Sequence, residues 1–176
     1  LEYASVSGSR RVGTLVGHAI GTTFSACSVR NCEVSGDCYV GGMVGVAEKS
    51  TFENITVDEI ALTVGKGYLS SAYSGGMVGY ASDVRRIVNV SVSSATPISV
   101  PKLANVGGVG GYVYGSGALV ENCTSSVSVE GLKSVGVLFG QFSGGSGSRA
   151  LVRNCRASAE FATGATGSNY KGIGGL

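Results

Sequence analysis

The sequence predicts an all-β fold, namely a β-solenoid or parallel β-helix of about five coils with a period of about 32 residues. Three observations support this prediction: a glycine-rich motif that recurs along the chain, an asparagine that follows each complete copy, and alternating apolar and polar residues around that asparagine. Residues 1–176 are therefore expected to form a single repeat domain.

The glycine motif is clearest at residues 40–45 and 74–79, which read VGGMVG and SGGMVG. The copies start near residues 12, 40, 74, 106 and 135, and a truncated sixth starts near residue 173. Glycine inside a strand pattern indicates a bend or a close approach of two backbones. The fourth motif position is always apolar, so we expect it to form one buried core row. This row would contain Leu15, Met43, Met77, Val109 and Leu138.

The second landmark has the pattern apolar-x-Asn-apolar, as in residues 52–55 and 87–90. Its flanks alternate and are rich in β-branched residues, which is typical of strands. No window shows helical periodicity, which argues against TPR, ankyrin and HEAT repeats. WD40 and kelch blades are longer, at roughly 40–50 residues, and carry aromatic signatures that this chain lacks.

The recurring asparagine has a geometric interpretation. A residue in the left-handed region would reset the alternation, and asparagine tolerates that conformation better than most residues. We therefore expect a ladder of asparagines at one corner of successive coils. The ladder would contain Asn31, Asn54, Asn89, Asn122 and Asn154. In-register stacking at about 4.8 Å would also place Arg30 beside Glu53 and Glu121 beside Arg153 on the outer face.

These residues resemble the GLUG repeat, a family named for its Gly-Leu-hydrophobic-Gly core. The resemblance runs from Val12 to Leu176 and is best in the second to fourth copies, whereas Thr14 and Val137 replace the third-position glycine in the first and fifth. It implies a β-helix-like stack. GLUG-type repeats occur as accessory, non-catalytic segments of large secreted or surface-attached proteins, including adhesin-like proteins and an immunoglobulin-A-cleaving metalloprotease.

The composition argues against a nucleic-acid partner and against insertion into a membrane. The chain has 30 glycines, no tryptophan and a formal net charge of +2, and its basic residues are scattered rather than clustered. Nucleic-acid binders usually carry a clustered basic stripe, so no nucleic-acid partner is expected. No apolar run reaches the roughly 18 residues of a membrane span, so no membrane insertion is expected.

We expect no catalytic, cofactor or metal site. The single histidine, His18, occupies a motif position that also holds valine, tyrosine and glutamine. The three aspartates, Asp37, Asp58 and Asp83, lie at different places in the repeats, whereas polysaccharide-cleaving β-helices need converging carboxylates or Ca²⁺. The sequence therefore predicts that the chain is not an enzyme.

Two kinds of covalent modification are compatible with the sequence. Cys27 and Cys38 lie in the same repeat and could pair in an extracellular chain. Asn54, Asn89 and Asn122 lie in N-glycosylation sequons, although the corner geometry already accounts for an asparagine there. Cys32, Cys123 and Cys155 each follow a landmark asparagine, and we interpret them as small apolar residues of the core.

The expected role is that of a non-catalytic structural or adhesive segment, extracellular or at the cell surface, such as a stalk, a filament or a surface adhesin. An alternative is a glycan- or receptor-binding module that uses a tyrosine-bearing face, with Tyr73, Tyr80, Tyr112 and Tyr114 as its candidates. A second alternative is a degenerate polysaccharide-active β-helix. Expected partners are glycans, host or cell-surface proteins, and further copies of the chain or flanking repeats that stack on residues 170–176.

Overall fold

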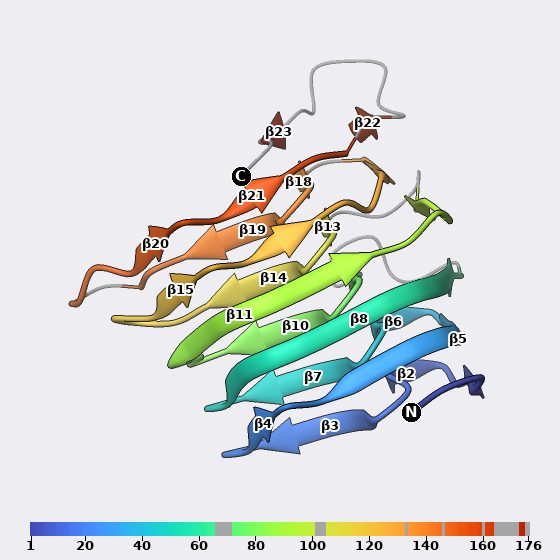
Figure 1. Ribbon diagram of the computed structural model, residues 1–176, viewed down its shortest axis with the longest axis horizontal. Helices are drawn as coiled ribbons and strands as arrows, with labels where there is room; N and C mark the ends of the chain where they lie inside the picture. Colours follow the sequence, from blue (N-terminus) through green and yellow to red (C-terminus); the bar gives the residue numbers. More distant parts are fainter. Residues whose placement is uncertain are drawn as a thin grey trace.

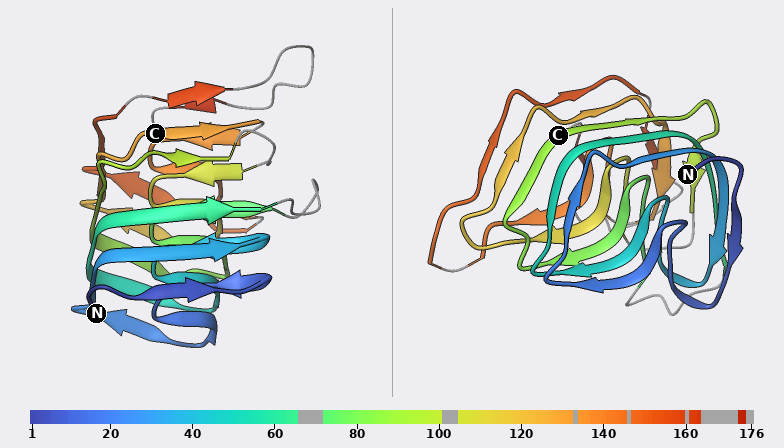
Figure 2. Two further views of the ribbon diagram at one scale, coloured as in Figure 1. Left: turned by 90° about the vertical axis from the view of Figure 1, so that its right-hand side faces the viewer. Right: turned by 60° about the horizontal axis from the view of Figure 1, so that its bottom comes forward.

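The computed structural model describes residues 1–65, 72–100, 105–132, 134–145, 147–159, 161–163 and 173–174. The regular secondary structure of these residues consists of β-strands, which pair in parallel (Figure 1). Successive coils stack along one axis, with the N-terminus near one end of the stack (Figure 2). The predicted all-β solenoid, with a period of about 32 residues, is therefore confirmed.

The strands of the described residues form four parallel sheets. Sheet 1 holds the strands that lead into each glycine turn: β2 (Arg10–Val12), β6 (Cys38–Gly41), β9 (Tyr73–Gly75), β13 (Asn105–Gly107), β18 (Ser134–Gly136) and β23 (Ile173–Gly174). Sheet 2 holds the strands that leave the turn: β3 (Val16–Ile20), β7 (Val44–Glu48), β10 (Val78–Ser82), β14 (Gly110–Tyr114) and β19 (Phe139–Ser143).

The longer strands belong to sheet 3, which carries the asparagine landmark. It contains β1 (Ser5–Ser7), β4 (Thr23–Ser25), β5 (Ser28–Gly36), β8 (Thr51–Val64), β11 (Arg86–Ser93), β15 (Leu119–Glu121), β16 (Thr124–Ser125), β20 (Leu151–Arg153) and β21 (Arg156–Ala157). Sheet 4 is short and contains β12 (Ile98–Ser99), β17 (Val129–Gly131) and β22 (Phe161–Thr163).

The fourth motif position forms the core row, as predicted, with one exception. Met43, Met77 and Val109 are 0% exposed and Leu138 is 1% exposed. Leu15 is 43% exposed, so its predicted burial is wrong. It belongs to the first coil, where the next coil covers it from one side, its backbone N–H donating to the Met43 carbonyl oxygen over 3.0 Å.

The motif glycines permit sheets 1 and 2 to touch backbone to backbone. A Cβ added to Gly79 would lie 2.7 Å from the carbonyl carbon of Tyr39 and 2.8 Å from the nitrogen of Val40, closer than real Cβ atoms approach. A Cβ on Gly111 would similarly lie 2.6 Å from the nitrogen of Ser74. The predicted close backbone approach is therefore confirmed, and a side chain at either position would separate the two sheets.

The asparagine corner adopts the left-handed conformation that the sequence predicts. The φ angles of Asn54, Asn89, Asn122 and Asn154 lie at 57°, 55°, 54° and 55°. This lets Phe52 and Ile55, which flank Asn54, both point into the core, where they are 0% and 1% exposed. Four of the five predicted corner residues therefore share one geometry.

Asn31 does not belong to this corner, and that part of the prediction is wrong. Strand β8 is long enough to pair with β4 at one end and with β5 at the other. Both pairings have the same register, which places Ala26 opposite Asn54, directly after the pair Ser25–Glu53, and Ala26 has a φ of 53°. Asn31 lies beside Glu59 instead, at a second left-handed corner where their φ angles are 50° and 49°.

Candidate functional site

The asparagine corner is a hydrogen-bonded ladder along the stack. The side-chain nitrogen of Asn89 donates to the side-chain oxygen of Asn54 over 2.9 Å, and that of Asn122 donates to the oxygen of Asn89 over 3.0 Å. All three side chains are exposed, so the sequons at Asn54, Asn89 and Asn122 face solvent. Their amides already connect neighbouring coils, and glycosylation of these residues stays a prediction.

Charged pairs line the outer face beside this ladder. Arg153 Nε lies 2.8 Å from Glu121 Oε1, which confirms the predicted pairing of these two residues. Glu53 instead pairs with Arg86, whose Nε lies 2.9 Å from Glu53 Oε1. The predicted contact between Arg30 and Glu53 is wrong because Arg30 lies opposite Asp58 in the register of β5 and β8.

A cluster of tyrosines bridges the outer edges of sheets 1 and 2. Tyr80 and Tyr112 stack with ring centroids 5.3 Å apart and an interplanar angle of 7°. Tyr73, from sheet 1, lies 5.4 Å from Tyr80 and 5.5 Å from Tyr112. Tyr39 lies 5.6 Å from Tyr73 and 5.8 Å from Tyr80. We call Tyr39, Tyr73, Tyr80 and Tyr112 the tyrosine cluster.

The structure thus brings together three of the four tyrosines that the sequence indicated. Tyr114 lies farther along β14, opposite Ser143, and its hydroxyl extends toward Gly145. Tyr39 was missed by sequence reasoning, although a signal was available. It stands two residues before the motif glycine Gly41, as Tyr73 stands before Gly75, and this shared spacing places both on sheet 1.

Burial and crowding alter the acidity of the tyrosine cluster. The pKa of Tyr73 is raised, first by partial burial and then by its neighbours Tyr39, Tyr80 and Tyr112. The pKa of Tyr80 is raised as well, first by burial and then by Tyr112. Both phenols are therefore uncharged at neutral pH, and the cluster presents aromatic rings and hydroxyl groups rather than charge.

In the first coil a polar group replaces the tyrosines. His18 occupies the position of Tyr80 and Tyr112, and its Nε2 lies 2.8 Å from Glu48 Oε1. Its Nδ1 lies 3.4 Å from Nη1 of Arg11. The part of the chain that the structure describes contains no group of three or more His, Cys, Asp or Glu side chains placed to hold a metal ion.

The cysteines predicted to pair do not meet. Cys27 lies at the corner between β4 and β5, in sheet 3, whereas Cys38 begins β6 in sheet 1 and is 2% exposed. Because the two residues lie in different sheets, the predicted disulfide between them is wrong. Their closeness along the chain does not persist in space because the coil carries the two residues to different faces.

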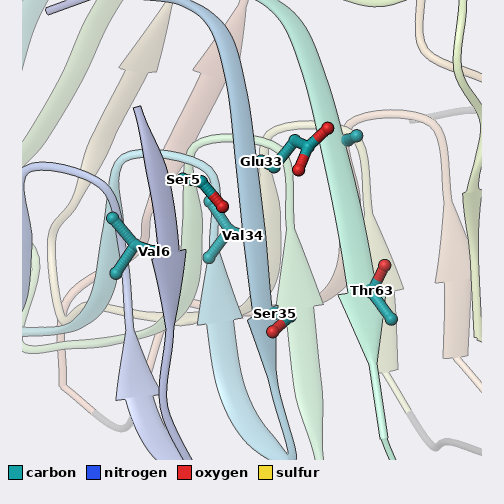
Figure 3. Close-up of a pocket in the computed structure, with 7 residues that line it drawn as sticks. Ser5, Val6, Glu33, Val34, Ser35 and Thr63 are labelled. Atoms are coloured by element: carbon teal, nitrogen blue, oxygen red, sulfur yellow. The ribbon is translucent and has the colours of Figure 1, made fainter. Parts of the chain in front are cut away.

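A shallow polar hollow of about 270 Å³ lies on the outer face of β1, β5 and β8 (Figure 3). It is lined mainly by Ser5, Glu33, Ser35 and Thr63, and the hydroxyl of Ser35 donates to that of the nearby Ser7 over 3.1 Å. Small side chains in register on three strands create this hollow. Sequence reasoning did not single it out because the register of β1 was not predicted.

The described residues form strands and include no helix that is long and apolar enough to cross a membrane. No curated protein and no solved structure matches the chain. The family model of the GLUG motif matches residues 103–130, which contain the fourth glycine turn and the corner at Asn122.

The matched copy is equivalent in structure to its neighbours on both sides. Val106 and Gly107 pair with Ser74 and Gly75 of the third copy, and with Val135 and Gly136 of the fifth. The same turn, close sheet contact and corner therefore recur from coil to coil. Residues 103–130 therefore carry a GLUG motif, and the copies on either side share its structure.

Proposed function

We propose that the chain is a non-catalytic structural or adhesive segment of a protein that lies outside the cell or at its surface. The observation that carries this proposal is the continuous coil-to-coil bonding along the stack. In the described residues sheet 1 runs through six strands, and the ladder from Asn54 to Asn122 connects the coils at the corner in sheet 3. Such a stack transmits load and holds its outer faces in a fixed register.

Location and role can be tested separately. Antibodies raised against the folded chain should label intact cells that produce the full-length protein, and external protease should remove the label. Labelling that requires permeabilised cells would contradict the proposed location. Beads coated with the chain should adhere to target cells if the role is adhesive, whereas a purely structural segment would leave the beads free.

A second candidate function is a glycan- or receptor-binding module, and the tyrosine cluster favours it. All four rings are half-buried, and they come from two sheets that converge on one surface. Tyr80 and Tyr112 cover one another's inner faces, so a ligand would contact ring edges, hydroxyls and the outer faces of the cluster. Aromatic rings of this kind stack on sugars and anchor protein interfaces.

A glycan array and cell binding with the variant Tyr73→Ala test this candidate. Tyr73 contacts the other three members, so its removal should abolish binding by the cluster. Tyr3→Ala is the matched control, because Tyr3 is 79% exposed and lies at another corner of the coil. Equal binding by the two variants would exclude the tyrosine cluster as the binding surface.

Stacking of further copies or flanking repeats on the ends belongs to the same proposal. Apolar side chains are exposed in the first coil, where Leu15 and Ile20 are 43% and 63% exposed, and in the fifth, where Leu151 is 50% exposed. Most of residues 170–176, which we expected to pair with a following coil, lies outside the described residues. Sedimentation should show association that Ile20→Lys weakens and Ser91→Lys does not, since Ser91 is exposed in the middle of sheet 3, and a monomer at all concentrations would contradict it.

A further inference from the structure

The register of sheet 3 brings two cysteines from consecutive coils side by side. Glu121 pairs with Arg153, and Thr124 pairs with Arg156, so Cys123 and Cys155 are opposite one another between these pairs. The backbone N–H of Arg156 donates to the carbonyl oxygen of Cys123 over 2.8 Å, which shows that the ladder is continuous at this point. Neighbouring strands lie about 4.8 Å apart, within the roughly 4.4–6.8 Å that separates the Cα atoms of disulfide-bonded cysteines.

The two thiols also point in the same direction. The Sγ atom of Cys123 donates to the carbonyl oxygen of Glu121 over 3.4 Å, and that of Cys155 donates to the carbonyl oxygen of Arg153 over 3.3 Å. Each bond reaches the residue two positions earlier, so the side chains have equivalent orientations on adjacent strands. Burial raises the pKa of Cys123 to about 12, and the next largest cause is the neighbouring Cys155, which indicates that the two sulfurs interact.

We propose that Cys123 and Cys155 form an oxidation site, at which a disulfide joins the fourth and fifth coils when a low-molecular-weight disulfide is available. The site follows from the repeat itself. An Asn-Cys step in two consecutive copies places the two thiols in one row of the stack, although they are 32 residues apart in the sequence.

The reaction is thiol–disulfide exchange in two steps, with the small disulfide as oxidant. Cys155 is half-buried whereas Cys123 is 0% exposed, so Cys155 reacts first. Its thiolate attacks one sulfur of the small disulfide, and a mixed disulfide forms as one small thiol leaves. The thiolate of Cys123 then attacks Sγ of Cys155, and the second small thiol leaves. The protein loses two electrons and two protons, and the small disulfide becomes two thiols.

The second step is expected to limit the rate. It requires the thiolate of Cys123, and the raised pKa of this thiol keeps the thiolate fraction small at neutral pH. As long as the pH stays below that pKa, each unit by which the pH rises should accelerate closure about tenfold, because the thiolate fraction rises by that factor. The mixed disulfide at Cys155 should accumulate first and then disappear.

The experiment incubates the reduced full chain with oxidised glutathione at about pH 8 and follows the intact mass. We expect a transient glutathione adduct and then a species lighter than the reduced chain by two hydrogen atoms. After blocking of free thiols and tryptic digestion without reductant, residues 103–133 should be linked to residues 154–156, which contain Cys123 and Cys155 respectively. Reductant should release the two peptides.

Two serine variants make the assignment specific. Cys155→Ser should neither form the adduct at this site nor lose the two hydrogens. Cys27→Ser is the matched control, because Cys27 is also half-buried at the same corner position but its neighbour in the next coil is Ile55. This variant should close as fast as the unaltered chain.

Two results would overturn the proposal: a stable glutathione adduct at Cys155 that never resolves, or a linked peptide that joins other cysteines. Because the reaction is measured on the purified chain, its outcome does not depend on where the protein resides. A chain that closes in vitro yet is found inside cells would contradict the proposed location and leave the oxidation site intact.

Discussion

Asn89 bonds to Asn54 through their side chains, with 2.9 Å between the donating nitrogen and the accepting oxygen. The two residues lie in consecutive coils and share the left-handed conformation, with φ angles of 55° and 57°. One residue type thus satisfies two requirements at this corner. It tolerates a positive φ, and its amide both donates and accepts a hydrogen bond along the stack.

The ladder predicts an unusual order of substitution effects at Asn89. Asn89→Gly keeps the left-handed conformation and loses the side-chain bonds, worth about 0.5–1.5 kcal/mol each. Asn89→Ala loses the same bonds and adds strain of about 1–2 kcal/mol at positive φ. Urea unfolding should therefore find the alanine variant less stable than the glycine variant. The reverse order would show that the flexibility of glycine in the unfolded chain outweighs the strain of alanine at positive φ.

The close contact of sheets 1 and 2 predicts that Gly79→Ala is severely destabilising. The added Cβ would meet the Tyr39 and Val40 backbone, which cannot shift without separating the sheets. Gly21→Ala is the control, since Gly21 has a φ of 61° and no atom within 4 Å of the added carbon. It should cost only the left-handed strain of about 1–2 kcal/mol. Thermal unfolding by circular dichroism compares the two, and equal losses would contradict the packing argument.

The core row predicts that Met77→Asp prevents folding, because Met77 is 0% exposed and an unpaired charge there has no hydrogen-bonding partner to replace water. Leu15→Asp changes the equivalent residue of the first coil, which is 43% exposed, and should leave the chain folded. Solubility and the cooperativity of thermal unfolding distinguish the outcomes. A Met77→Asp chain that melts cooperatively would refute the alignment of the row.

The tyrosine cluster predicts a loss of stability at alkaline pH. Burial and neighbouring phenols raise the pKa of Tyr73 above the ordinary 10.0, so the folded chain holds this proton more tightly than the unfolded chain. The contribution to stability is complete below pH 10.0 and decreases as the pH rises from there through the folded-state pKa. Urea unfolding midpoints should fall in this range, and less so in Tyr73→Phe. An unchanged slope in that variant would argue against coupling within the cluster.

Much of the fold could be predicted from the sequence alone. The recurring glycine turn indicated the repeat, its period indicated a solenoid, and the apolar fourth position indicated the core row that includes Met43 and Met77. The conformation at Asn54 followed from local chemistry, since few residues tolerate a positive φ. These features are local or periodic, so each copy repeats the signal.

Only the tertiary structure decided which residues of different coils meet. The first coil keeps one register with the second in sheets 1, 2 and 3, so that Ala26 rather than Asn31 joins the corner and Asp58 rather than Glu53 lies opposite Arg30. The spacing of Gly13 and Gly41 matches this pairing, whereas that of Asn31 and Asn54 does not, so the two landmarks disagreed in the first coil and only the strand pairing decided between them. The same stacking separates Cys27 from Cys38, sets Cys123 beside Cys155, and adds Tyr39 to the tyrosine cluster.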